Sequence, residues 1–118
     1  MTACDSLVQL RDALRHFATE REWEPFHTPG NLAMSLMIEA AELGEHFQWE
    51  RAPTADAMTE TRREAIALEM ADVLLYLVRL ADTLQVDLVE AARRKMDLNA
   101  RRYPVEASRG RAGRPEST

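Results

Sequence analysis

The stretch that most constrains the fold is residues 31–50, NLAMSLMIEAAELGEHFQWE. At about 100° per residue, its apolar side chains form two stripes on roughly opposite sides, one through Leu36 and one through Met37. A helix with this pattern is buried on two sides. Glu39 and Glu42 lie three residues apart beside the first stripe. An uncompensated carboxylate there would be costly or would take up a proton, so a compensating group is expected nearby.

A second stretch, residues 64–84, repeats this pattern of two apolar stripes. Glu69 and Asp72 stand three residues apart beside one stripe, and Tyr76 lies one turn beyond Asp72. Side chains at i and i+3 share a helix face, with Cβ atoms about 5 to 6 Å apart. Antiparallel packing of the two helices would therefore bring both carboxylate pairs around one small volume. A hard divalent cation such as Mg²⁺ or Mn²⁺ is the natural occupant, because these ions bind carboxylate and water oxygens.

Length and composition narrow the class of protein. With 118 residues the chain is expected to form one domain with a modest core, yet two of its helices are apolar on two sides, so oligomerisation is expected. The net charge of −5 argues against a general nucleic-acid binder, which needs a basic footprint.

The expected location is cytoplasmic. Cys4 is the single cysteine, which excludes an internal disulfide and a cysteine-based zinc site and is common in intracellular chains. The chain carries no signal peptide and no apolar run near 18 residues, so no membrane association is expected.

The chain is expected to be all-α, because strand-type alternation is nowhere evident. Ser6 with Gln9 and Asp87 with Glu90 form capping-box patterns, and Thr59 or Thr61 can cap the third helix. The predicted helices cover about residues 5–21, 31–48, 60–84 and 87–103.

A domain of residues 1–104 is expected to precede a tail, residues 105–118. The tail has no apolar period and contains Gly, Pro, Ser and Arg, so we expect it to be disordered.

Residues 22–30, EWEPFHTPG, form a shaped loop rich in aromatic side chains. Trp23 and Phe26 could simply seal one end of a helical bundle. Alternatively, they could wall a pocket for a flat aromatic ligand, with His27 or Asn31 supplying hydrogen bonds. The residues alone leave both interpretations open.

Three polar residues of the fourth predicted helix, Lys95, Asn99 and Arg102, share one face at i, i+4, i+7 spacing. A solvated polar stripe is the commoner outcome for such a face. If it points toward the carboxylates, it offers hydrogen-bond donors to phosphate oxygens.

Three chemistries fit the paired carboxylates. A di-iron bundle of the ferritin type needs Glu-x-x-His, but Glu45 follows Glu42 at that spacing and residues 64–84 contain no such motif, so this interpretation is weak. A purely structural acidic cluster would suffer mutual repulsion. Mg²⁺-assisted attack on a phosphorus centre needs only oxygen ligands and a few cationic donors, and the sequence contains both.

The carboxylate pairs and several longer segments resemble the MazG-like all-α nucleoside triphosphate pyrophosphatases. Glu39-x-x-Glu42 and Glu69-x-x-Asp72 look like the ExxE and ExxD pairs of that family. The resemblance extends over residues 6–104 and is strongest to the dCTP pyrophosphatase branch. The segments that carry it are REWEPFHTPGNL (21–32), EAAELGEHFQW (39–49), ADVLLYLV (71–78), VDL (86–88) and KMDLNARRYP (95–104).

The resemblance implies a fold, an assembly and a reaction. It implies a four-helix MazG-like bundle that assembles as a homo-oligomer, a dimer of dimers in this branch. It also implies Mg²⁺-dependent hydrolysis of a nucleoside triphosphate to the monophosphate and pyrophosphate, in sanitation of the nucleotide pool. The expected substrate is dCTP or a modified cytosine nucleotide.

The resemblance also implies residue roles. The expected metal ligands are Glu39, Glu42, Glu69 and Asp72. Glu45 would help to orient water, although an exposed surface glutamate is an equal interpretation. Trp23, Trp49, Phe26 and His27 would surround the base, with Asn31 as a further donor. The residues expected at sugar or phosphate are Tyr76, Lys95 and Asn99. Lys95, and less directly Arg102 or Arg79, would offset the charge that develops on phosphate oxygens.

Three positions depart from the animal members of that branch. Leu14 stands where those enzymes carry a base-contacting histidine, and Gly30 and Glu50 replace basic residues. These differences bear on base selectivity more than on reaction type. The alternative function is an inactive helical oligomerisation or regulatory module, but the intact set of carboxylates argues against it.

Overall fold

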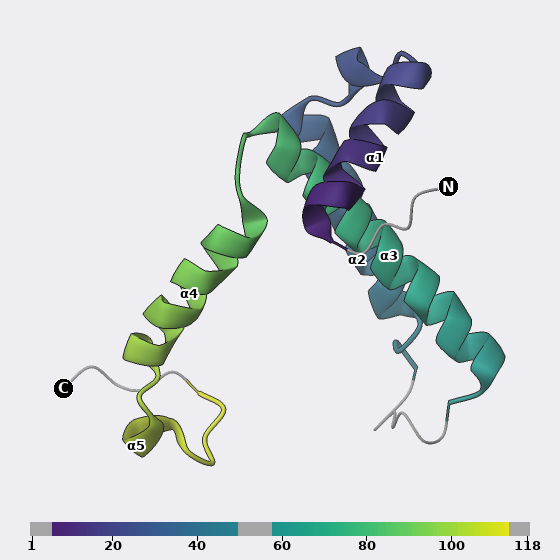
Figure 1. The fold of residues 1–118 in the computed structure, drawn as a ribbon. Coiled ribbons are helices and arrows are strands. Elements are labelled where there is room, and N and C mark those ends of the chain that lie inside the picture. Colours follow the sequence, from purple (N-terminus) through teal and green to yellow (C-terminus); the bar gives the residue numbers. More distant parts are fainter. Residues whose placement is uncertain (1–5, 50–57, 114–118) are drawn as a thin grey trace. The chain divides into compact units, whose positions relative to one another are not determined.

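A computed structural model describes residues 6–49 and 58–113 of the chain, and all its regular elements are helical (Figure 1). The expected all-α class is confirmed, and the described residues contain no strand. The elements, in order, are α1 (Leu7–Glu20), the short 3₁₀ helix η1 (Glu24–Phe26), α2 (Pro29–Glu45), α3 (Glu60–Thr83), α4 (Leu88–Arg102) and α5 (Val105–Ser108).

Side-chain caps begin the four long helices. Ser6, Thr59 and Asp87 accept hydrogen bonds from backbone N–H groups three residues on, which confirms the predicted caps of α1, α3 and α4. Thr28 caps α2 in the same way, and Pro29 occupies its first turn. The fixed φ of proline suits that position, so α2 begins two residues before the expected start at Asn31.

The end of α2 also differs from the prediction. The helix ends at Glu45 rather than near Gln48. Beyond it the backbone hydrogen bonds tighten to i−3 spacing, from Phe47 N to Gly44 O at 3.0 Å and from Gln48 N to Glu45 O at 3.3 Å. Residues 46–49 are therefore turns, not α-helix.

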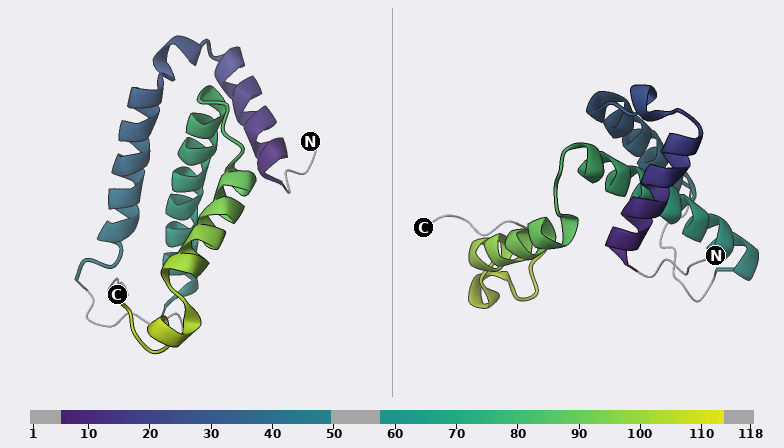
Figure 2. Two further views of the ribbon diagram at one scale, coloured as in Figure 1. Left: turned by 90° about the vertical axis from the view of Figure 1, so that its left-hand side faces the viewer. Right: turned by 45° about the horizontal axis from the view of Figure 1, so that its top comes forward.

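The first of two compact units ends at Gln85 and contains α1 to α3. In it α2 packs along α3, and α1 packs against another side of α3 (Figure 2). The buried apolar side chains are few and come from all three helices. They are Ala18, Leu32, Ile66, Val78 and Ala81.

Part of the apolar surface of the two central helices is exposed in this unit. Met34, Met37 and Ile38 of α2 are more than half exposed, and so are Leu68 and Met70 of α3. A helix that is apolar on all sides is normally buried. The exposed apolar faces of α2 and α3 are therefore not covered by other parts of this unit.

The second unit begins at Val86 and contains α4 and α5. The expected domain of residues 1–104 spans the division after Gln85, and its boundary stays a prediction. The expected disordered tail needs a correction at Val105–Ser108, because Pro104 at the N-cap starts a further helical turn there. Residues 114–118 lie outside the described residues. None of the described helices is long and apolar enough to cross a membrane.

Candidate metal and substrate site

Three carboxylates meet between α2 and α3. Glu39 of α2 and Glu69 and Asp72 of α3 each offer an oxygen atom, and these atoms lie within 4.8 Å of one another. Glu69 and Asp72 reach this position together because i and i+3 side chains share a helix face. Oxygen-rich clusters of this charge suit Mg²⁺ or Mn²⁺ rather than a thiophilic metal.

Two carboxylate oxygens of the cluster receive no hydrogen bond from the described residues. Oε2 of Glu39 and Oε2 of Glu69 are buried and have no hydrogen-bond partner in the described structure. Loss of hydration raises the pKa of Glu39 to about 7, assisted by the hydrogen bond and charge of Glu42 and by the charges of Asp72 and Glu69. A divalent cation would satisfy these oxygens and neutralise the repulsion, so the residues fit the metal that the sequence predicted.

Glu42 and Glu45, the other two acidic residues of α2, lie outside the three-carboxylate cluster. Glu42 is half-buried one turn beyond Glu39 and interacts with that carboxyl group, but it is not part of the cluster within 4.8 Å. Glu45 is exposed at the last position of α2.

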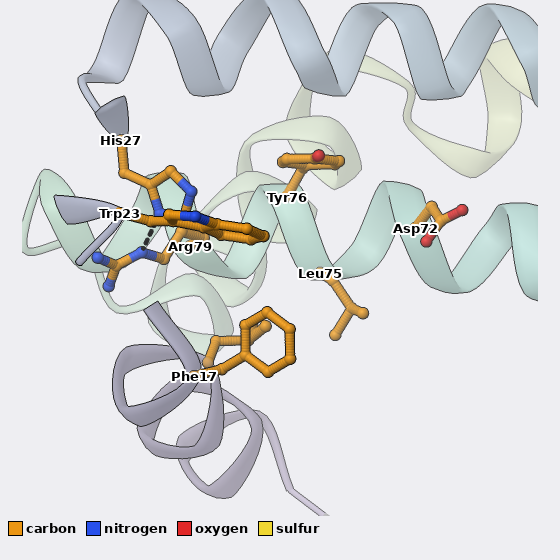
Figure 3. A pocket seen from close by; sticks show the side chains of 8 residues that line it. Phe17, Trp23, His27, Asp72, Leu75, Tyr76 and Arg79 are labelled. Atoms are coloured by element: carbon orange, nitrogen blue, oxygen red, sulfur yellow. Dashed lines mark hydrogen bonds between the residues drawn. The ribbon is translucent and has the colours of Figure 1, made fainter. Parts of the chain in front are cut away.

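A pocket of about 170 Å³ opens beside the acidic cluster (Figure 3). Asp72 belongs to both the cluster and the pocket wall, so the two sites are contiguous. The other lining residues come from α1, the loop after it, and α3. They are Leu14, Phe17, Trp23, His27, Leu75, Tyr76 and Arg79.

A helix-terminating turn directs Trp23 into this pocket. Glu22 adopts the left-handed conformation with φ 54°. Its N–H bonds to Thr19 O at 3.1 Å, while the N–H of Trp23 bonds to Ala18 O at 2.9 Å. These two hydrogen bonds form a Schellman motif, which reverses the chain at the end of α1.

Aromatic contacts then fix the walls of the pocket. The Trp23 ring meets Phe17 edge-on at a centroid distance of 5.7 Å and His27 at 6.0 Å. Edge-to-face packing of this kind adds to the burial energy of the rings. A flat apolar surface with Tyr76 and Asp72 further along α3 suits an aromatic heterocycle carrying a polar substituent (Figure 3).

A chain of charged side chains lies behind the pocket. Arg79 donates from Nε to Nδ1 of His27 at 3.0 Å and from Nη1 to Asp82 Oδ2 at 3.2 Å. Arg15 of α1 holds the same carboxylate in a two-point contact of 3.0 and 2.6 Å. The hydrogen bond and charge of Arg15 lower the pKa of Asp82 despite its burial, with a further contribution from Arg79.

The structure brings together some of the expected base-binding residues and not others. Trp23, His27 and Tyr76 line the pocket. Phe26 and Trp49 do not line it and are 67% and 87% exposed. Asn31 is directed to the loop instead, where its side chain donates to Phe26 O at 3.0 Å.

The predicted phosphate donors Lys95, Asn99 and Arg102 are exposed on α4. They belong to the second compact unit, which begins at Val86.

Some residues of the pocket wall and of the charged network beside it were not predicted from the sequence. Phe17 and Leu75 lie in apolar stripes that look like ordinary core positions, so their pattern carries no separate signal. Asp82 and its partner Arg15 are 67 residues apart. A possible signal was the pair Arg79 and Asp82 at i, i+3 within an otherwise apolar helix, because buried charges need partners.

Comparison with known proteins decides the family. The model of the MazG-like family matches residues 34–113. The chain belongs to the MazG-like family. The resemblance stated from the sequence is thereby confirmed, and the matched region includes the whole acidic cluster.

Curated relatives of this MazG-like chain include dCTP pyrophosphatase 1 of Bos taurus, 46% identical over 109 residues that cover 91% of this chain and 64% of the relative. The Homo sapiens protein of the same name is 43% identical over 106 residues, 88% of this chain and 62% of the relative. The MazG-like chain thus spans slightly less than two thirds of the length of these relatives.

A solved structure is similar over nearly its whole length. The crystal structure of a pyrophosphatase from Archaeoglobus fulgidus DSM 4304 has a TM-score of 0.76 and 42% identity, and the match covers 88% of this chain and 97% of that one. The helical architecture of the MazG-like chain is therefore that of a known pyrophosphatase structure.

Proposed function

We propose that this protein is a Mg²⁺-dependent nucleoside triphosphate pyrophosphohydrolase. It would cleave a nucleoside triphosphate, dCTP or a modified cytosine nucleotide first among them, to the monophosphate and pyrophosphate. The observation that carries the proposal is that Asp72 belongs to both the acidic cluster and the wall of the aromatic pocket. The names of the relatives support the same reaction.

The acidic residues have distinct roles in this proposal. Glu39, Glu69 and Asp72 hold the ion, and Glu42 completes the set from the next turn of α2. A bound Mg²⁺ would neutralise phosphate charge and lower the pKa of a coordinated water. Glu45, at the end of α2, is proposed to orient the attacking water. Because the pKa of Glu39 is raised to about 7, its carboxyl group would have to lose its proton before it could bind the ion.

The pocket residues would position the nucleoside. Trp23 would supply the flat apolar wall for the base, and Tyr76, on α3 one turn beyond Asp72, would contact the sugar or phosphate. Stacking on an aromatic face tolerates any base, so selectivity has to come from hydrogen bonds at the base edge. Lys95, Asn99 and Arg102 remain the proposed donors to phosphate oxygens, where a cation offsets developing charge.

The assembly is proposed to be a homo-oligomer in the cytoplasm. The outward apolar faces of α2 and α3 support self-association, because exposed patches of large apolar residues commonly mark protein interfaces.

The test is pyrophosphate release from a panel of canonical and modified ribo- and deoxyribonucleoside triphosphates, with Mg²⁺ or with EDTA. We expect metal-dependent release that is fastest for dCTP or a 5-modified relative. If the folded protein gains thermal stability from Mg²⁺ but cleaves no triphosphate, the proposed reaction is wrong and an inactive ligand-binding module remains.

A further inference from the structure

The hydrogen bond between Arg79 and His27 restricts the chemistry of the histidine. A guanidinium group has only N–H donors and stays charged in proteins. Because Arg79 Nε donates to His27 Nδ1 at 3.0 Å, Nδ1 must carry a free lone pair. His27 is then neutral, and its ring proton is on Nε2.

The second ring nitrogen is directed to the pocket. Figure 3 shows His27 with the Arg79 contact on one side of the ring and the other nitrogen turned away from Arg79, on the side where Tyr76 lies. Burial and the nearby charge of Arg79 lower the pKa of His27, in agreement with a neutral ring. The pocket wall therefore presents an N–H donor beside the Trp23 ring.

Arg79 is held in place for this contact. Its side chain is buried, with the whole residue 8% exposed, and it donates to Asp82, which is 9% exposed. Arg15 of α1 fixes Asp82 from the other side through two hydrogen bonds. The orientation of His27 thus depends on three charged residues from two helices, none of which follows from the loop sequence.

We propose that Arg79 is a positioning residue that fixes His27 as an Nε2–H donor, and that this donor recognises an acceptor on the edge of the bound base, a ring carbonyl or an unprotonated ring nitrogen. The inference rests on the proposed function, because the ligand is the base of the substrate nucleotide. Cytosine carries such acceptors at O2 and N3. Loss of Arg79 would leave His27 free to exchange tautomers and ring orientations.

The first measurement is the tautomer of His27 in the nucleotide-free protein, from two-bond ¹H–¹⁵N correlations near pH 7.5. His27 is assigned with a His27→Gln variant, and His16, whose Nε2 contacts Glu20 at 2.7 Å, is an internal reference. We expect the Nε2–H form alone in the wild type and a mixture in Arg79→Met. Arg21→Met is the matched control, because Arg21 contacts the pocket residue Phe17 but not His27.

The second measurement is steady-state kinetics with dCTP. We expect Arg79→Met to raise KM about tenfold with little change in kcat, the effect of one hydrogen bond that forms equally in the ground and transition states. A fall in kcat instead would place Arg79 at the phosphate and would overturn the positioning role.

The outcomes separate this inference from the proposed function. A wild-type His27 that is cationic or protonated on Nδ1 overturns the inference without any variant or substrate. Active enzyme with unchanged KM in Arg79→Met overturns the inference alone. The expected tautomer in a protein that neither binds nor cleaves nucleotides shows instead that the proposed function is wrong, and the base-recognition role is lost with it.

Discussion

Glu39 combines two properties that conflict in the metal-free chain. It is a predicted metal ligand, yet loss of hydration and neighbouring carboxylates raise its pKa to about 7. Near neutral pH, proton and metal therefore compete for the same oxygens, and metal affinity must rise with pH.

The first prediction follows from this competition. Glu39→Gln should lower the rate of pyrophosphate release by more than about 100-fold, since it removes a proposed metal ligand itself and not a residue that only orients a ligand. The metal-free fold should be as stable as the wild type or more so, because the substitution relieves repulsion.

Both effects are measured with the same protein, by turnover and by thermal melts with and without Mg²⁺. Glu64→Gln is the matched control, an exposed glutamate of α3 outside the site, and should retain activity and Mg²⁺ stabilisation. Full turnover in Glu39→Gln would exclude Glu39 as a ligand.

The second prediction concerns pH. A carboxyl group whose folded pKa is about 7 and whose ordinary value is 4.5 binds its proton more tightly in the folded state. Its contribution to stability is fully present below about pH 4.5 and is lost as pH rises toward 7.

The measurement is the free energy of unfolding in EDTA between these pH values, as the difference between wild type and Glu39→Gln. The subtraction cancels the contributions of groups that both proteins share. One of these is Asp82, whose lowered pKa makes the fold less stable as the pH falls. Parallel pH profiles would contradict the raised pKa of Glu39.

At the scale of elements, the turn after α1 directs Trp23 into the pocket wall. Its C′ position is normally glycine, because a β-carbon is disfavoured in the left-handed conformation. Here Glu22 occupies it with φ 54°. The strained backbone at Glu22 therefore belongs to the turn that orients Trp23.

The third prediction is that Glu22→Gly stabilises the protein by about 1 kcal/mol, because glycine removes that strain. The control is Glu24→Gly in η1, where no positive φ needs relief and stability should fall. Chemical denaturation measures both. If Glu22→Gly destabilises the fold, the side chain of Glu22 has a role that the turn geometry does not show.

At the scale of the whole molecule, the described residues leave much apolar surface exposed. The buried apolar core is small, whereas large apolar residues on the outer faces of α2 and α3 stay exposed. Burial of such surface returns roughly 25 cal/mol per Å², so association of copies would add substantially to stability.

The fourth prediction tests those faces. Met37→Glu places a charge on the outer face of α2, where Met37 is 57% exposed, and should shift the protein to a smaller species. Sedimentation velocity reports the change in mass. Val8→Glu, at an equally exposed position of α1, should leave the assembly unchanged. A wild-type monomer at micromolar concentration would refute the assembly itself.

Local interactions explain why much of this protein was predictable. Caps at Ser6, Thr59 and Asp87 involve residues three positions apart, and the carboxylate pairs share helix faces for the same reason. Periodicity therefore determined the helices and put each carboxylate pair on one helix face, whereas the packing of α2 along α3 brought Glu39 to Glu69 and Asp72. The sequence by itself also carried the family, since its motifs keep their spacing along the chain.

Only the tertiary structure decided how the pocket is built. The aromatic loop left two interpretations open for Trp23 and Phe26, and packing against α1 and α3 took Trp23 into the wall and left Phe26 exposed. The tautomer of His27 depends on Arg79, 52 residues away, and on a carboxylate that Arg15 reaches from α1. Contacts at such separation leave no periodic trace in a sequence, because they form only when the helices pack.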